Sequence, residues 1–147
     1  MTGDTLGEKM TAVKFLEQYE EAVRVVARCQ EEYETEAMLI DAVRSLSDND
    51  GMPHGSGISK PTEDKAVRLA DKRMRLIDAK LEAIAIRQGV FDVVNRVDGV
   101  AGDVLYQRYI LLKKWDDIYT AVKYSESQTW RYYRIGLDQV SQILGEK

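Results

Sequence analysis

The sequence predicts an all-α protein: a long antiparallel helical hairpin, followed by a C-terminal helix-turn-helix unit of three helices. Apolar residues recur every three or four residues over two long stretches, which is the period of an amphipathic helix. The only two prolines, Pro53 and Pro61, lie between those stretches, so both stretches can stay helical. No useful length of chain alternates apolar and polar residues, so no strand is expected.

The first long helix is predicted over residues 11–46. Its apolar positions fit a heptad register with one polar interruption at Gln30, and no glycine or proline falls within it. The register residues are Leu16, Tyr19, Val23, Val26, Tyr33, Ala37 and Ile40. The acidic run at residues 31–36 is interpreted as the solvent-facing side of this helix, because charge runs on helices usually face water.

A loop is predicted over residues 47–62, which are rich in glycine, serine, proline and aspartate. His54, the only histidine, lies there and is interpreted as a solvated loop residue. The second long helix is predicted over residues 63–97, again with a heptad register. Its register residues are Val67, Ala70, Met74, Ile77, Leu81, Ile84 and Phe91. Two long helices joined by one loop most simply fold back on each other, and we expect both register sets to be core or coiled-coil contacts.

A second break is predicted at residues 97–103, where Gly99 and Gly102 occur, followed by a short helix over residues 103–112. We therefore divide the chain into a hairpin, residues 1–98, and a helix-turn-helix region, residues 99–147. A thin two-helix hairpin has little core of its own. We expect it to pack on the rest of the chain, to self-associate or to bind a partner helix.

Residues 115–134 have the length and pattern of a helix-turn-helix. The positions where its helices should face one another hold Ile118, Val122, Tyr124, Thr129 and Tyr132. Two positions depart from the usual pattern. Tyr119 stands where a small residue is usual, and Lys123 stands in the turn, where glycine is often needed.

Ser125 is the predicted N-cap of the second helix, with Gln128 three residues later as in a capping box. This start point leaves a set of side chains facing outward that can read base edges and phosphates in a major groove. Flanking lysines would contact the DNA backbone. The candidate DNA-binding residues are Glu126, Ser127, Gln128, Trp130, Arg131, Arg134, Lys113, Lys114 and Lys123. For Trp130, packing in the core against the previous helix is the alternative to exposure.

The composition excludes several other classes of protein. No nucleotide-binding loop, catalytic triad or metal-ligand spacing occurs, so we expect no enzyme, no metal and no cofactor. Cys29 is the only cysteine, and no signal peptide or membrane span is apparent, so we expect a cytoplasmic protein. The net charge of −4 belongs to the first helix: residues 1–50 carry twelve acidic and five basic side chains, whereas residues 101–147 carry six and seven.

Residues 105–140 resemble region 4 of bacterial sigma factors and, more closely, phage late-transcription regulators of the ArpU/RinA type from Gram-positive hosts. The marks are "RYI" at 108–110, "WDDI" at 115–118, "YS" at 124–125 and "YRIGL" at 133–137. The loop "DGMPHGSGISKPTEDKAVRLAD", residues 50–71, is also similar to a loop between two long helices in such phage proteins. The resemblance implies a prophage-encoded DNA-binding regulator in the host bacterial cell, with double-stranded DNA and RNA polymerase as candidate partners.

Two alternatives remain open at this point. A DNA-packaging protein of the small-terminase kind also joins a helix-turn-helix to a helical oligomerisation region, and would form a ring of many subunits. A protein-interaction module would instead use the acidic hairpin to bind a host protein and would show no affinity for DNA.

Overall fold

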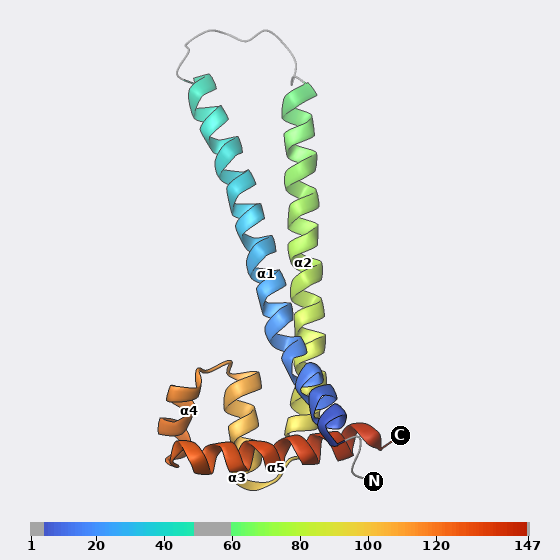
Figure 1. Cartoon of the computed structure of the whole chain (residues 1–147). Helices are drawn as coiled ribbons and strands as arrows, with labels where there is room; N and C mark the ends of the chain where they lie inside the picture. Colours follow the sequence, from blue (N-terminus) through green and yellow to red (C-terminus); the bar gives the residue numbers. More distant parts are fainter. Residues whose placement is uncertain (1–4, 49–59, 147) are drawn as a thin grey trace. The chain divides into compact units, whose positions relative to one another are not determined.

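The computed structural model describes residues 5–48 and 60–146, which are helical apart from short connections. Two long helices, α1 (Thr5–Asp48) and α2 (Lys60–Val94), pack antiparallel (Figure 1). Three shorter helices follow and pack together: α3 (Gly99–Leu105), α4 (Trp115–Val122) and α5 (Glu126–Gly145). The prediction of an all-α hairpin followed by three C-terminal helices is confirmed.

Both long helices extend a few residues beyond the prediction on the loop side. α1 ends at Asp48 and α2 begins at Lys60. Pro61 therefore lies in the first turn of α2, where its missing N–H costs no helical hydrogen bond. His54, predicted to be a solvated loop residue, lies outside the residues that the structure describes.

The chain forms two packing units whose division differs from the expected one at residue 98. One unit comprises residues 23–82, the middle of the hairpin, and the other comprises residues 1–22 and 83–147. The ends of both long helices therefore share a core with the C-terminal helices. Its fully buried members include Leu16 from α1, Val90 from α2, Val104 and Leu105 from α3, Ile118 from α4 and Val140 from α5.

Polar contacts also tie the start of α1 and the end of α2 to α5. The Ser141 hydroxyl donates a hydrogen bond of 3.0 Å to the backbone oxygen of Glu8. Lys9 Nζ lies 3.7 Å from an Asp138 carboxylate oxygen. Arg96, just after α2, lies 2.8 Å from Glu146 through Nη2 and Oε2. These contacts are largely exposed, so the apolar core contributes most of the stability of this unit.

The predicted heptad register of α1 is confirmed. The heptad residues predicted for α2 are wrong, because they do not form the face that packs toward α1. The α1 register residues are all buried or half-buried. On α2 the predicted residues Val67, Ala70, Met74, Ile77, Leu81 and Ile84 are exposed, and Phe91 is half-buried. The less exposed face instead consists of Leu69, Lys72, Leu76, Ala79, Ala83, Ile86 and Val90. Both sets have three-and-four spacing, so α2 carries two apolar stripes.

The middle of the hairpin has little core, as expected. Among the described side chains of residues 23–82 only Leu76 is buried. An ion pair joins the two helices here, with Lys72 Nζ at 4.0 Å from Glu36 Oε2. Glu31, Glu32 and Glu34 are exposed, so this part of the acidic run does face solvent.

The second break is shorter than predicted, because Gly102 lies within α3. A Cβ built on Gly102 would lie 2.2 Å from the backbone oxygen of Val97, so the close approach of two backbones requires glycine here. Gly99 begins α3 with φ of +70° and is the residue that makes the turn. The predicted helix over 103–112 is thus the continuation of α3, which passes into a π-helical turn, η1 (Tyr106–Ile110).

Candidate nucleic-acid interface

A tight turn joins α4 to α5, the two helices of the predicted helix-turn-helix. Asp116 and Asp117 lie in the first turn of α4, where carboxylates interact favourably with the helix dipole. Lys123 ends α4 in the left-handed conformation, with φ of +62°, and its N–H donates to the Tyr119 carbonyl at 3.0 Å. Lys123 therefore occupies a left-handed backbone position that favours glycine. Such a position is usual where a helix ends in a tight turn, and a residue with a Cβ is strained there.

Ser125 caps α5 as predicted. Its backbone is extended and its Oγ accepts a hydrogen bond of 3.2 Å from the Gln128 N–H. Because the cap satisfies one of the free N–H groups at the helix start, it fixes which residue begins the helix. The facing directions of all side chains in the following turns depend on that start.

The residues expected between the helices do turn inward. Ile118 and Thr129 have no exposed surface, and Val122, Tyr124 and Tyr132 are half-buried. The rings of Tyr124, in the turn, and Tyr132, on α5, pack together with their centroids 5.3 Å apart. Thr129 has a buried Oγ1 without a hydrogen-bond partner.

Tyr119 fits at its crowded position because its ring lies beside the indoles of the unit. Its hydroxyl accepts a hydrogen bond of 3.0 Å from Trp130 Nε1, and its ring stacks near Trp115 with centroids 6.4 Å apart. The large side chain therefore does not separate α4 from α5 and instead links them.

Trp130 does not point outward as predicted. It is half-buried, its ring stacks on Trp115 with centroids 4.4 Å apart, and its N–H is used by Tyr119. The inward face of α5 runs through Thr129, Tyr133, Gly136, Leu137 and Val140, and Trp130 flanks it. Tyr133 was not predicted as core, although it lies four residues after Thr129, which is one helical turn.

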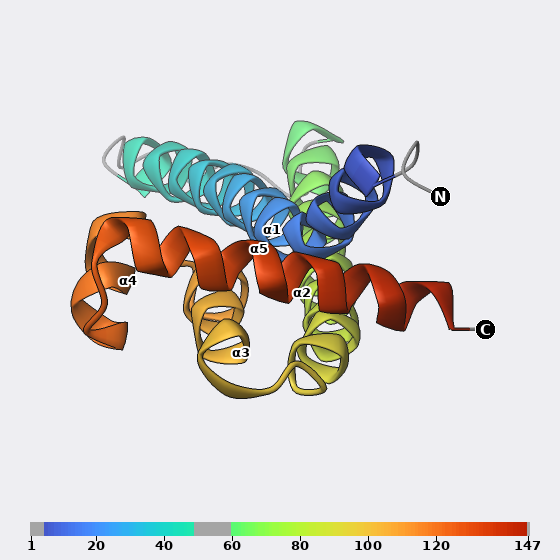
Figure 2. The same cartoon turned by 60° about the horizontal axis from the view of Figure 1, so that its bottom comes forward.

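The remaining candidates on α5 form an exposed face. They are Glu126, Ser127, Gln128, Arg131 and Arg134. All lie in the first three turns of α5, whose N-terminal end lies beside α4 (Figure 2). Amide, hydroxyl and guanidinium groups thus share one face, with the acidic Glu126 at the helix start, where it interacts favourably with the dipole.

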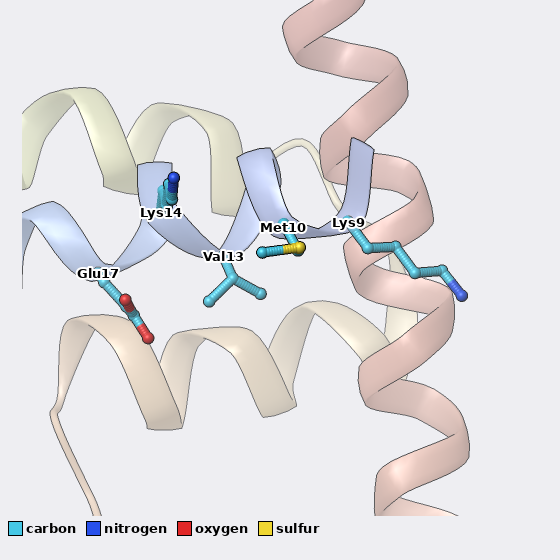
Figure 3. A pocket seen from close by; sticks show the side chains of 5 residues that line it. All are labelled: Lys9, Met10, Val13, Lys14 and Glu17. Atoms are coloured by element: carbon cyan, nitrogen blue, oxygen red, sulfur yellow. The ribbon is translucent and has the colours of Figure 1, made fainter. Parts of the chain in front are cut away.

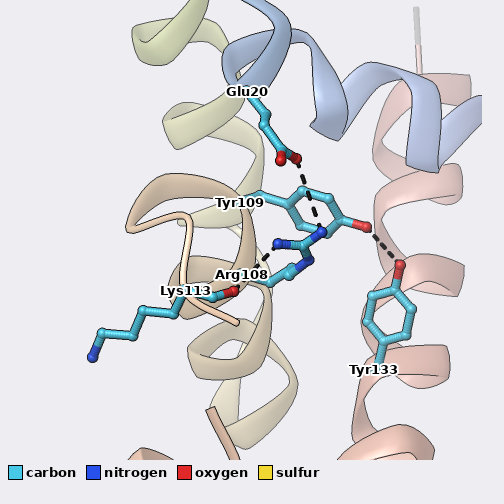
Figure 4. Close-up of polar contacts among 5 residues, drawn as sticks. All are labelled: Glu20, Arg108, Tyr109, Lys113 and Tyr133. Atoms are coloured by element: carbon cyan, nitrogen blue, oxygen red, sulfur yellow. Dashed lines mark hydrogen bonds and ion pairs between the residues drawn. The ribbon is translucent and has the colours of Figure 1, made fainter. Parts of the chain in front are cut away.

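The three flanking lysines all lie at the ends of α4. Lys114 and Lys123 are exposed, and Lys113 is half-buried. Figure 4 shows the Lys113 side chain pointing away from the neighbouring Arg108, while its backbone oxygen accepts a hydrogen bond of 3.2 Å from Arg108 Nη1. Residues 113–134 carry five basic and three acidic side chains, so this part of the chain is basic although the whole chain is acidic.

Arg108 supports the approach to α4, a role that sequence reasoning missed. Its Nη2 lies 3.9 Å from Glu20 Oε2 on α1, and its guanidinium lies 5.9 Å from the ring centroid of Tyr109 (Figure 4). The guanidinium also lies 5.8 Å from the ring centroid of Trp115. One side chain thus joins α1, η1 and the segment before α4. The arginine of the "RYI" mark at 108–110 has this structural use, and its spacing alone does not reveal it.

A buried pair of tyrosines joins η1 to α5. The hydroxyls of Tyr109 and Tyr133 lie 2.5 Å apart, and their rings stack with centroids 6.4 Å apart (Figure 4). Burial raises the pKa of Tyr109, and its hydrogen bond with Tyr133 adds to this. Burial also raises the pKa of Tyr133, and its hydrogen bond with Tyr109 partly offsets the rise. Both hydroxyls stay neutral at physiological pH and position α5.

Two open hollows lie elsewhere in the same unit. One, of about 310 Å³, is lined by Lys9, Met10, Val13, Lys14 and Glu17 on α1. Figure 3 shows Val13 and Glu17 projecting to the same side of α1 and Lys14 to the other. The other, of about 1170 Å³, lies between the start of α1 and the end of α5.

Within the described residues no three histidine, cysteine, aspartate or glutamate side chains come close enough to hold a metal ion. Likewise, none of the described helices combines the length and apolar character needed to cross a membrane.

Comparison of the chain with protein-family models, with curated proteins and with solved structures returns no match. The geometry of α4, the turn and α5 is therefore the main support for a functional assignment.

Proposed function

We propose that the C-terminal unit binds double-stranded DNA, with the first three turns of α5 as the recognition element. The observation that carries this proposal is the Ser125 cap. It fixes a helix start at which Gln128, Arg131 and Arg134 are exposed, while Thr129 and Tyr133 are buried against the rest of the unit. In helix-turn-helix proteins the N-terminal part of the second helix contacts base edges in the major groove.

The exposed groups suit that task chemically. A glutamine amide can pair bidentately with adenine, and an arginine can pair with guanine or with a phosphate. Lys114 and Lys123, at the two ends of α4, would contact phosphates on either side of the groove. Glu126, at the tip of α5, would accept a hydrogen bond from a cytosine amino group or repel a phosphate.

The biological role we propose is regulation of transcription in a phage or prophage, acting on late genes. It is supported by the resemblance of residues 105–140 to sigma-factor region 4 and to ArpU/RinA-type regulators. It is also supported by the helix-turn-helix geometry in that same segment. RNA polymerase is then the protein partner that such a regulator would contact.

The test is selection of bound fragments from the encoding genome, followed by affinity measurements at several salt concentrations. If Lys113, Lys114, Lys123, Arg131 and Arg134 all contact phosphates, log K should fall against log salt with a slope of about −4.5. Arg131→Ala and Arg134→Ala should each weaken binding, and a variant that loses only a phosphate contact should reduce the slope by about 1.

The matched control is Arg96→Ala. It removes the same charge at the other end of α5, where Arg96 forms an exposed ion pair with Glu146. Binding that all three arginine variants weaken equally would show non-specific attraction only. No binding at low salt would contradict the proposal and favour the protein-interaction module. A ring of many subunits bound to one DNA site would favour the small-terminase alternative.

A further inference from the structure

The middle of α2 carries an apolar stripe that no described part of the chain covers. We call this set, Val67, Ala70, Met74, Ile77 and Leu81, the outer stripe. Val67, Met74 and Leu81 have 59%, 55% and 60% of their surfaces exposed. The spacing of three and four residues continues without interruption, as in one side of a coiled coil.

The outer stripe and the face toward α1 lie on opposite sides of α2. We call the residues of the less exposed face of α2, from Leu69 to Val90, the inner set. Each outer-stripe residue precedes a member of the inner set by two residues, for example Val67 before Leu69 and Met74 before Leu76. Two residues turn a helix by about 200°. A second helix can therefore pack on the outer stripe without displacing α1.

The charges that border the outer stripe have opposite signs on its two sides. Arg73 and Lys80 each precede the first apolar position of a heptad, Met74 and Leu81. On the other side, Asp71 follows Ala70 and Asp78 follows Ile77. All four charged side chains are exposed. In a coiled coil these bordering positions decide which helix pairs with which, and in which direction.

We propose that the outer stripe is the pairing surface for a second copy of this chain, with the two α2 helices parallel and in register. In that arrangement Arg73 of each copy lies opposite Asp78 of the other, which gives two symmetric ion pairs. In an antiparallel arrangement positions on the same side meet instead. Arg73 would then lie near Lys80, and Asp71 near Asp78, and both contacts are repulsive.

This inference goes beyond DNA binding and does not depend on it, because every residue in it lies in the unit formed by residues 23–82. The thin core of that unit adds to the argument, since only Leu76 is buried among its described side chains. Covering five further apolar positions would supply the burial that the isolated hairpin lacks.

The first experiment measures the mass of the full chain in solution over a range of concentrations. We expect twice the chain mass of 16.8 kDa. Met74→Lys should yield the monomer with unchanged helicity, because Met74 contacts solvent in the single chain. Met38→Lys is the matched control, since Met38 is 71% exposed on α1. A monomeric wild-type chain at about 100 μM, above the micromolar range of stable interfaces, would overturn the proposal.

The second experiment tests direction and register by exchanging charges. Arg73→Glu and Asp78→Arg should each weaken dimerisation about tenfold at low salt, because each replaces two attractive contacts with repulsive ones. The double variant should restore dimerisation, since the pairs are reformed with reversed sign. An antiparallel dimer would behave oppositely, because each single change would then introduce an attraction to Lys80 or Asp71. Single variants that dimerise as well as or better than wild type would refute parallel pairing.

A disulfide provides an independent measure of the same geometry. In a Cys29→Ser background, Met74→Cys should form an intermolecular disulfide readily, because equivalent core positions of parallel helices face each other. Arg68→Cys, on an exposed position outside the stripe, should not. Equal cross-linking at both positions, or disruption of the dimer by Met38→Lys rather than Met74→Lys, would show that a different surface pairs the chains.

Discussion

Replacing Thr129 with valine should stabilise the C-terminal unit, although threonine stands at the centre of the proposed DNA-binding motif. Thr129 has no exposed surface, and its Oγ1 has no hydrogen-bond partner. Burying a hydroxyl unpaired costs about 1–3 kcal/mol. Valine has nearly the same shape and the same branching at Cβ, so packing and helix propensity change little.

The expected gain is therefore about 1–2 kcal/mol in the free energy of unfolding. For a chain of this size it corresponds to a rise of roughly 2–8 °C in Tm. The assay is urea denaturation followed by tryptophan fluorescence. It reports on this unit specifically, because Trp115 and Trp130 are the only tryptophans and both lie in it.

Thr129→Ser is the matched comparison. It keeps the hydroxyl and removes only the methyl group, so it should destabilise the unit by about 1 kcal/mol. Because Thr129 faces away from the exposed side of α5, DNA affinity should change little in the valine variant. A valine variant less stable than wild type would show that the hydroxyl has a partner, and would refute this reasoning.

Three further predictions concern backbone geometry and pH. Gly102→Ala should destabilise the unit by more than about 3 kcal/mol, because a Cβ would lie 2.2 Å from the Val97 oxygen; urea midpoints would measure this. Lys123→Gly should stabilise the unit by about 0.5–1 kcal/mol, because glycine adopts the left-handed backbone conformation of residue 123 without strain. The urea midpoint should rise accordingly. Burial raises the pKa of both Tyr109 and Tyr133, so as pH rises the two hydroxyls lose their protons in the unfolded chain before they do in the folded one. Stability should therefore fall as pH rises above about 10, and less steeply in Tyr109→Phe, when midpoints at pH 9 and 11 are compared.

Helical period and caps predicted the elements of this fold well, because both are local properties of the sequence. The start of α5 follows from Ser125 alone, and the hairpin follows from two long apolar repeats. The face of α2 toward α1 did not follow, because two stripes offset by two residues have the same spacing. The stripe with larger aliphatic residues proved to be the exposed one. The inner set contains Ala79 and Ala83, whose small size suits a close approach of the two helices.

Among the candidate residues on α5, exposure was predicted correctly where it depends on helix phase alone. Gln128, Arg131 and Arg134 are exposed, as the cap implies. Trp130 was assigned to the wrong environment, because its partner Trp115 lies on another helix and their stacking is a tertiary contact. The part played by Arg108 depends on Glu20, 88 residues earlier in the chain, and no local pattern contains that information.

The most direct test of DNA binding by α5 is a titration of ¹⁵N-labelled protein with a short DNA duplex at low salt, followed by backbone amide shifts. A dimer of two 16.8 kDa chains remains within reach of such spectra when the protein is also deuterated. If α5 binds DNA, shifts should be concentrated at Ser127, Gln128, Arg131 and Arg134 and at the two ends of α4, with little change at the end of α5 near Glu146. Absence of shifts, or shifts concentrated on other helices, would show that α5 is not the DNA-binding element.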